Sequence, residues 1–254
     1  MLVSKFLPPV FTQKCRDVIR TAGKPALLYQ NPKLELTPSL DLVLSHFCRT
    51  HDDVRFLQIG AFDGMKGDPL FPLIEKYPLS GTLVEPQPEP FQRLQFNYSQ
   101  FDLSRFTFVN AAISEQDGSI PFYKVSVRPG DPSWLPELAS FDRKVILKMR
   151  RQVKDCESRI YASDVRSVTF SSLFAELKTE RVDLLQIDAE GYDSEILRLF
   201  DVPKRAPAII RFEHRFMSKP EHISWVRMLT EQGYKVALES HDTLAYKVDS
   251  TRMQ

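Results

Sequence analysis

Cysteine is scarce in this sequence, which has Cys15, Cys48 and Cys156 among its 254 residues. The three cysteines lie far apart, are odd in number and form no CxxC pair. This pattern argues against a disulfide framework and against a zinc site built from paired cysteines. We interpret all three as reduced thiols with structural roles.

An excess of charge and a long apolar run are also missing. Lys and Arg number 34 and Asp and Glu number 33, so no net charge favours nucleic acid or an anionic membrane as a partner. Two prolines and a lysine interrupt the start MLVSKFLPPVF before a signal-peptide core or a membrane span could form. We therefore expect a cytoplasmic protein with no integral membrane segment and no nucleic-acid partner.

The first 50 residues predict a helical extension to a single main domain. One helix is expected over 14–22, and a second after Thr37 and Pro38, where the threonine would cap the helix and the proline would be its first residue. The extension could contribute to a homodimer contact or only cover its own sheet. With 43% hydrophobic residues, the chain can bury one full core, and we place the main domain at 51–254.

Residues 51–254 alternate between short apolar runs and amphipathic stretches. Strands are predicted within 55–60, 81–86, 105–113, 182–188, 207–214, 234–240 and 243–248, and helices within 69–77, 88–98, 168–177, 193–200 and 221–232. Such alternation implies right-handed crossovers and a mostly parallel sheet with helices on both faces. The last two strands are close enough to form an antiparallel hairpin. The predicted fold is therefore α/β and Rossmann-like, with seven strands.

The alternation breaks over 127–164, which is too long for a simple connection and which we interpret as an inserted lid. Its basic residues either contact an acceptor or only keep an exposed helix in solvent. They are Arg143, Lys144, Lys148, Arg150, Arg151 and Lys154.

A glycine-containing turn follows the first predicted strand. Gly60 and Gly64 can adopt positive φ and let a ligand approach the backbone closely, as the first strand-to-helix turn of a nucleotide-binding sheet requires. Asp68 and Pro69 would cap and start the next helix. The spacing is not GxGxxG, so by itself the turn is equally consistent with a purely structural role.

Polar residues end the second and third predicted strands. Glu85 lies about twenty residues beyond the glycine turn, where an acid can accept the ribose hydroxyls of an adenosine. The alternative is a surface glutamate before Pro86. Asn110 and Ala111 offer an amide and a small side chain to an adenine, although asparagine is also a common turn residue.

Two carboxylates and a histidine follow the fourth and fifth strands. Asp188 and Glu190 are expected to face the ligand crevice, because side chains at the carboxyl ends of central parallel strands line it. Capping of the helix at 193–200 is the alternative, and Asp193 suits that role equally well. His214 could accept a proton near neutral pH, or could be structural.

The segments LQIGAFDG, GTLVEPQPEPFQRLQFN, FVNAAIS, VTFSSLF and VDLLQIDAEGYDSEIL resemble, in order and spacing, the motifs of the FkbM family of methyltransferases. The resemblance runs from about Val54 to His214 and implies a class I methyltransferase fold with S-adenosylmethionine as cofactor. It also implies transfer to a hydroxyl of a sugar, glycan or natural-product scaffold. The cofactor-binding residues it implies are Gly60, Ala61, Phe62, Asp63, Gly64, Glu85, Asn110, Ala111 and Asp188.

Two residues depart from the family pattern. Gln58 stands where many members have an acid, and Asp63 stands where asparagine is common. The ammonium of the cofactor's methionine would then need Asp63, Asp188 or backbone carbonyls as acceptors.

Methyl transfer from a sulfonium is an in-line displacement, so alignment and exclusion of water are the main tasks, and an alcohol acceptor also needs a base. His214, Asp188 and Glu190 are the candidate catalytic residues. A divalent metal held by Asp188, Glu190 and Glu213 is a less favoured alternative, because no further ligand can be placed. The predicted acceptor-binding residues are Trp134, Phe141, Arg143, Lys144 and Lys148.

Two other functions compete with this one. A non-catalytic module could keep the adenosine pocket and use the insert to bind a partner, but such a binder needs no titratable groups in its crevice. A nicotinamide-dependent oxidoreductase is less consistent with the terminal hairpin and the imperfect glycine fingerprint. The choice of oxygen or nitrogen as acceptor rests on the resemblance alone.

Overall fold

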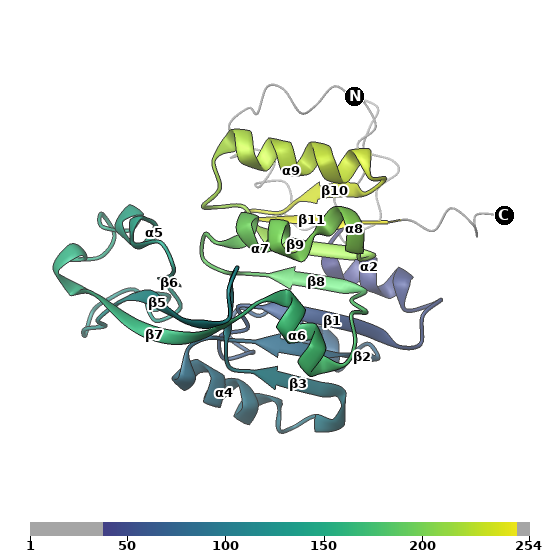
Figure 1. Cartoon of the computed structure of the whole chain (residues 1–254), viewed down its shortest axis with the longest axis horizontal. Coiled ribbons are helices and arrows are strands. Elements are labelled where there is room, and N and C mark those ends of the chain that lie inside the picture. The colour runs from purple at the N-terminus through teal and green to yellow at the C-terminus, as the bar shows by residue number, and fades with distance from the viewer. Residues whose placement is uncertain (1–37, 248–254) are drawn as a thin grey trace, which may run out of the picture. The chain divides into compact units, whose positions relative to one another are not determined.

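A seven-stranded sheet forms the centre of residues 38–247, the part of the chain that this computed structural model describes (Figure 1). Its order is β10-β11-β9-β8-β1-β2-β3, and β1 pairs in parallel with β2 and β8. β11 is antiparallel to both β9 and β10 and lies between them. This order confirms the predicted Rossmann-like fold class. The bounds are β1 Val54–Ile59, β2 Leu79–Val84, β3 Phe106–Val109, β8 Leu184–Ile187, β9 Ile209–Glu213, β10 Lys235–Leu238 and β11 Asp242–Tyr246.

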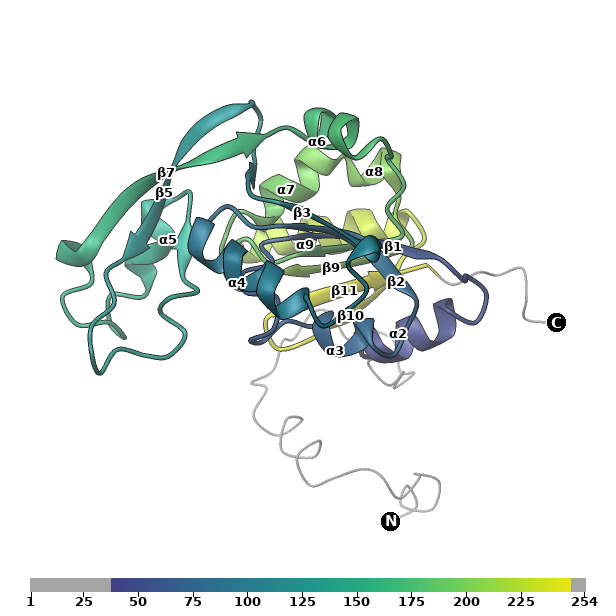
Figure 2. The ribbon, with the colours of Figure 1, turned by 90° about the horizontal axis from the view of Figure 1, so that it is seen from below.

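Helices cover both faces of this sheet (Figure 2). α2 (Leu40–Phe47), α3 (Phe71–Ile74) and α4 (Pro88–Tyr98) pack with Val54 and Phe56 on one face. α6 (Phe170–Leu177), α7 (Asp193–Phe200), α8 (Val202–Arg205) and α9 (Lys219–Glu231) pack with Leu57 and Ile59 on the other. Because side chains alternate along a strand, an apolar strand such as β1 can serve both cores.

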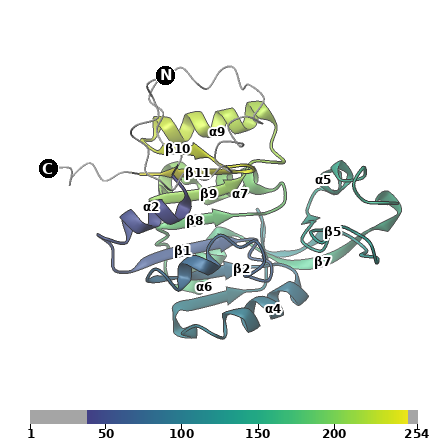
Figure 3. The same cartoon turned by 180° about the vertical axis from the view of Figure 1, so that it is seen from behind.

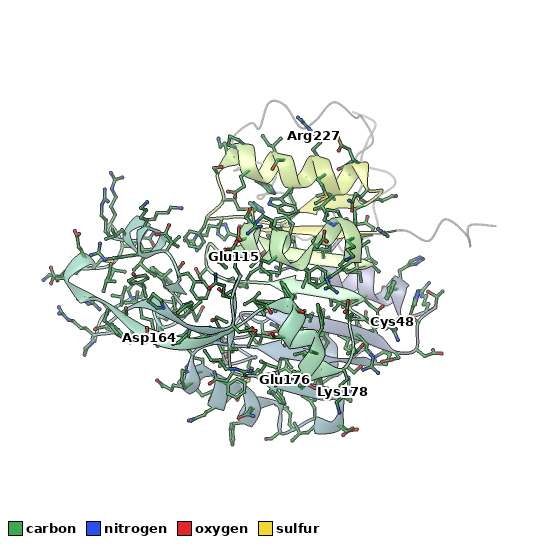
Figure 4. All side chains as sticks on the ribbon, viewed as in Figure 1. Cys48, Glu115, Asp164, Glu176, Lys178 and Arg227 are labelled. Atoms are coloured by element: carbon green, nitrogen blue, oxygen red, sulfur yellow. The ribbon has the colours of Figure 1, made fainter. Side chains whose placement is uncertain are left out.

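A second, four-stranded sheet of order β4-β7-β5-β6 projects to one side of the first (Figures 1 and 3). It comprises β4 (Ala112–Ile113), β5 (Gly118–Val125), β6 (Ala139–Ser140) and β7 (Ile160–Val168). The helix α5 (Arg143–Lys148) comes between β6 and β7 in the chain. The segment predicted as an insert, 127–164, therefore includes β6, α5 and the start of β7. It has its own small core, which includes Leu135, Ile146 and Val153. In Figure 4, Asp164 marks β7, and Glu176 and Lys178 mark the end of α6.

Three predicted elements differ from the structure. The strand expected over 105–113 is interrupted at Asn110 and Ala111, so that β3 belongs to the first sheet and β4 to the second. The helix expected over 69–77 spans only Phe71–Ile74. α2 is capped by Ser39, whose Oγ accepts from Leu42 N at 3.3 Å. The cap predicted at Thr37 and the helix predicted at 14–22 lie outside the described residues. Within 38–247, no helix is long and apolar enough to cross a membrane.

Candidate active site

A cleft lies at the carboxyl ends of β1, β2 and β8, where ligands bind in open parallel sheets. One wall of the cleft comes from the second sheet and the residues that flank β6. It consists of Phe122, Glu137, Ala139 and Phe141. The lining residues are 58–62, 66–69, 84–87, 111–113, 122, 137, 139, 141, 186, 188–190 and 196. The cleft thus joins segments from both sheets.

The glycine turn brings the ends of β1 and β8 into close contact. Gly60 has φ +80°, and its N–H and that of Ala61 donate to the Val84 carbonyl at 2.9 and 3.1 Å. A Cβ on Gly60 would lie 1.8 Å from the Asp188 carbonyl oxygen. Only glycine fits this position, both because of its backbone angle and because of this approach.

Two other residues of the predicted cofactor turn do not line the cleft. Asp63 Oδ1 accepts hydrogen bonds from the Met65 and Lys66 amides at 3.0 and 2.9 Å, and so closes the turn. A Cβ on Gly64 would meet the Leu94 side chain at 2.2 Å, so this glycine allows packing against α4. Gly60, Ala61 and Phe62 do line the cleft.

Glu85 is the most buried carboxylate of the cleft, 3% exposed. Its Oε2 accepts from Phe62 N at 2.9 Å, and its Oε1 accepts from Gln87 N at 2.8 Å. Burial raises its pKa to about 7, although the two amides act in the opposite direction. Each oxygen keeps a further lone pair with which to accept a ligand hydroxyl.

The residues predicted to contact adenine divide between two roles. Ala111 lines the cleft. Asn110 does not, because its Nδ2 donates to the backbone carbonyls of Glu85 and Pro86 at 2.8 and 3.2 Å. Asn110 therefore holds the strand end that carries Glu85.

Asp188 and Glu190 both line the cleft, in the turn between β8 and α7. The Asp188 carboxylate has no hydrogen-bond partner among the described residues. Burial and the neighbouring Glu190 raise its pKa well above the usual value. Burial, and then Asp193, raise the pKa of Glu190 to about 7. Glu190 can thus exchange a proton near neutral pH.

Asp193 holds the turn between β8 and α7 in place through hydrogen bonds to its backbone. It is 1% exposed, and it accepts hydrogen bonds from the amides of Ala189, Gly191 and Glu213 at 3.4, 3.3 and 3.2 Å. Burial raises its pKa to about 7. Asp193 is therefore a positioning residue for the carboxylates beside it.

His214 does not line the cleft, which corrects the expectation that it lies beside Asp188 and Glu190. Its Nδ1 is 3.0 Å from Thr243 Oγ1, and its ring stacks on His222 of α9 at a centroid distance of 4.3 Å. Burial lowers its pKa to about 4, so the ring is neutral at pH 7. His214 follows the end of β9, and its contacts with Thr243 and His222 direct its ring toward β11 and α9.

Glu213 also has a strongly raised pKa. Its Oε2 is buried without a hydrogen-bond partner, and burial, followed by Asp188 and Glu190, raises its pKa to about 10. A carboxyl with a folded pKa far above its usual 4.5 stabilises the fold fully below about pH 4.5, and this contribution is lost as the pH rises toward 10.

We therefore expect a higher melting temperature at pH 6 than at pH 8. Glu213→Gln, which mimics the protonated form, should raise the melting temperature at pH 8 by about 2–4 °C per kcal/mol gained and should reduce the difference between the two pH values. Circular dichroism melts of both proteins measure this. A wild type that melts higher at pH 8 than at pH 6 would contradict the shift.

The predicted acceptor residues are separated by the structure. Phe141 lines the cleft and contacts Phe122 and Tyr192 edge-on, at 4.9 and 4.8 Å between ring centroids. Trp134, Arg143, Lys144 and Lys148 do not line it. Trp134 packs on the small core of the second sheet, Arg143 lies 3.7 Å from Glu157, and Lys148 Nζ donates to the Phe216 carbonyl at 3.2 Å.

Sequence reasoning missed an ion pair that joins the glycine turn to the second sheet's side of the cleft. Lys66 pairs with Glu137, and its Nζ also donates to the Ser133 carbonyl at 2.8 Å. Lys66 and Glu137 both line the cleft. No local pattern could reveal a pair of residues so far apart in sequence.

The cleft lining has an excess of acidic residues. Among the described lining residues, Lys66 is the only basic one, against five acids: Asp68, Glu85, Glu137, Asp188 and Glu190. This lining suits a ligand with positive charge. Within 38–247, no group of three or more His, Cys, Asp or Glu side chains is arranged to hold a metal ion.

Comparison with known proteins gives one family match. The model of the methyltransferase FkbM domain matches residues 58–236. No curated protein matches the sequence. Among solved structures, the FkbM methyltransferase from Methylobacillus flagellatus KT is 12% identical with a TM-score of 0.48, and the match covers 77% of this chain and 44% of that one. This chain thus matches less than half the length of that structure.

Two other solved structures are similar at a comparable level. The precorrin-6y C5,15-methyltransferase from Geobacter metallireducens GS-15 is 15% identical with a TM-score of 0.39, and the match covers 85% of this chain and 92% of that one. TrmK from M. capricolum, solved in complex with S-adenosylhomocysteine, is 9% identical with a TM-score of 0.37, with 83% and 67% covered.

Proposed function

Because the chain belongs to the FkbM methyltransferase domain family, we propose that it catalyses S-adenosylmethionine-dependent methylation of a hydroxyl on a sugar, glycan or natural-product scaffold. The observation that carries this proposal is the meeting of the Gly60 turn, Glu85 and Asp188 in one cleft at the carboxyl edge of the sheet.

The described residues fit this cofactor. Gly60, Ala61 and Phe62 bring the backbone of the glycine turn to the cleft, and Glu85 has free lone pairs for the two ribose hydroxyls. The small side chain of Ala111 leaves room for a flat ring. The acidic lining complements a sulfonium, and the bound cofactor supplies the activated methyl group. Within the glycine turn, Asp63 closes the turn through the Met65 and Lys66 amides, and Gly64 allows it to pack against α4.

The chain's own contribution to the reaction is alignment and proton removal. The wall formed by Phe122, Ala139 and Phe141 excludes water and offers apolar surface to an acceptor ring. Asp188 accepts the proton of the acceptor hydroxyl, because its carboxylate is unpartnered and its pKa is raised well above the usual value, which makes it a stronger base. Glu190 is the second candidate, and His214 is disfavoured by its place outside the cleft.

Asp188→Asn tests this assignment. We expect kcat to fall by roughly 100-fold to 10,000-fold, the usual contribution of a general base, while binding of S-adenosylhomocysteine changes little. In the wild type, kcat should rise with pH as the carboxyl loses its proton. Methyl transfer to a panel of glycoside and polyketide hydroxyls measures both. A larger loss in His214→Asn than in Asp188→Asn would contradict the assignment.

The remaining predictions extend the proposal beyond the cleft. Trp134, Arg143, Lys144 and Lys148 lie outside the lining, so they can contact only the parts of an acceptor that extend past it. A cytoplasmic location and a homodimer stay predictions from the sequence.

A further inference from the structure

Gln58 places an unpartnered oxygen at the cleft. This residue of β1 is 2% exposed and lines the cleft below the glycine turn. Its Nε2 donates to Asp68 Oδ2 at 2.6 Å, whereas its Oε1 is buried and has no hydrogen-bond partner. A buried polar atom left unpaired is costly, so such an atom at a ligand cleft indicates a missing donor.

Asp68, the partner of Gln58, is a carboxylate without a cation. Its Oδ1 accepts from the Leu70 and Phe71 amides at 2.7 and 2.9 Å, and its Oδ2 accepts from Gln58. No basic side chain forms an ion pair with it among the described residues. Lys66, the basic residue of the lining, is paired with Glu137. A negative group of this kind is stabilised when a ligand brings a positive charge.

The two acceptors together define the donor that they need. Gln58 Oε1 can accept an N–H or O–H, and Asp68 Oδ2 has a further lone pair and a negative charge. An ammonium group offers three donors on one positive atom, and hydrogen bonds between charged groups are the stronger ones. Water could satisfy the oxygen but not the charge.

We propose that Gln58 and Asp68 together receive the ammonium group at the methionine end of the cofactor. This inference rests on the proposed function. The family resemblance places an acid at position 58, and in this chain the neighbouring Asp68 supplies the negative charge instead. Asp63 is not the acceptor, because it does not line the cleft and its Oδ1 is used by two amides of its own turn.

Two ligands separate this role from cofactor binding in general. S-adenosylhomocysteine carries the ammonium group, whereas 5′-methylthioadenosine has the adenosine half without the amino acid. Isothermal titration at pH 7.5 gives both affinities. Asp68→Asn keeps an oxygen for the Leu70 and Phe71 amides. We expect this variant to lower the affinity for S-adenosylhomocysteine by about 10-fold to 100-fold and the affinity for 5′-methylthioadenosine by less than about twofold.

Two further variants keep the test independent of folding. Gln58→Met removes the unpaired oxygen without changing the charge. It should lower the affinity for S-adenosylhomocysteine by about 3-fold to 10-fold, and the affinity for 5′-methylthioadenosine should change less. The double variant Gln58→Glu with Asp68→Asn moves the negative charge to the strand position, and should restore affinity to within about threefold of the wild type. Melting temperatures accompany each titration.

Each outcome bears on one of the two proposals. If the wild type binds neither ligand, the proposed function and this inference fail together. If it binds both and Asp68→Asn weakens them equally, the proposed function stands and the inference is wrong. Selective loss in Asp63→Asn but not in Asp68→Asn would also overturn it.

Discussion

Glu85→Ala is expected to abolish measurable binding of S-adenosylhomocysteine, with an affinity loss of about 100-fold to 10,000-fold. This range corresponds to two hydrogen bonds from ribose hydroxyls to a charged group, at about 1.5–3 kcal/mol each. The carboxylate is buried at the end of β2, and two backbone amides already orient it, so little order is lost when a ligand binds.

Glu85→Gln is the matched control for this experiment. It keeps the size of the side chain and one oxygen for the Phe62 or Gln87 amide, but it replaces the other acceptor with a donor. We expect an intermediate loss of affinity and a melting temperature close to that of the wild type. Unchanged titration curves in Glu85→Ala, with the fold intact by circular dichroism, would show that the cofactor does not use this carboxylate.

Gly60→Ala is expected to cause the largest loss of stability of any single methyl addition at the cleft. The new Cβ would stand 1.8 Å from the Asp188 carbonyl oxygen, and φ is +80°. Relief requires the end of β8 to move away from β1, which breaks the hydrogen bond of 2.9 Å from Asp188 N to the Ile59 carbonyl. We expect a destabilisation of at least about 4 kcal/mol, seen as a fall in melting temperature of roughly 10 °C, together with loss of cofactor binding.

Gly67→Ala separates the close contact from the backbone angle. Gly67 has φ +70°, close to that of Gly60, but a Cβ there would meet no atom within 4 Å. Only the backbone penalty of about 1–2 kcal/mol remains, so the melting temperature should fall by a few degrees. Equal losses in the two variants would mean that the approach of β8 to Gly60 is not a constraint on the fold.

The main sheet was predictable because its signals are local. Each of its strands is a short apolar run bounded by turn residues, and the close spacing of the last two strands indicates the β10–β11 hairpin. The carboxyl ends of parallel strands share one edge of the sheet. The positions of Gly60, Glu85 and Asp188 along the chain are therefore sufficient to indicate a common crevice.

Side-chain direction was harder to predict than strand position. Glu213 and His214 are adjacent in the sequence, but Glu213 ends β9 near the acidic group, whereas His214 lies beyond the strand and stacks on His222 of α9. Asn110 follows β3, and its side-chain amide donates a hydrogen bond to the backbone carbonyl of Glu85, just beyond the end of the neighbouring strand β2. In both cases the partner lies on another element, and the residues on either side in the sequence do not indicate it.

The second sheet was visible in the sequence only as a break in alternation. β5 and β7 pair antiparallel from Gly118 with Ser167 to Val125 with Ile160, and the segment between them folds on its own small core. Its aromatic and basic residues therefore divide between that core, the protein surface and the cleft. Composition alone could not distinguish these environments for Trp134 and Phe141.

The sequence by itself determined the fold class, the family and the strand ends that carry the site, because these depend on periodicity and on motifs within short segments. Only the tertiary structure decided which polar groups meet. Two pairs of residues come from different segments: Lys66 with Glu137, and Gln58 with Asp68. The buried Oε1 of Gln58 remains without a hydrogen-bond partner at the cleft. Such pairings depend on how segments pack in three dimensions, where burial fixes the energetic cost of leaving a polar atom unpaired.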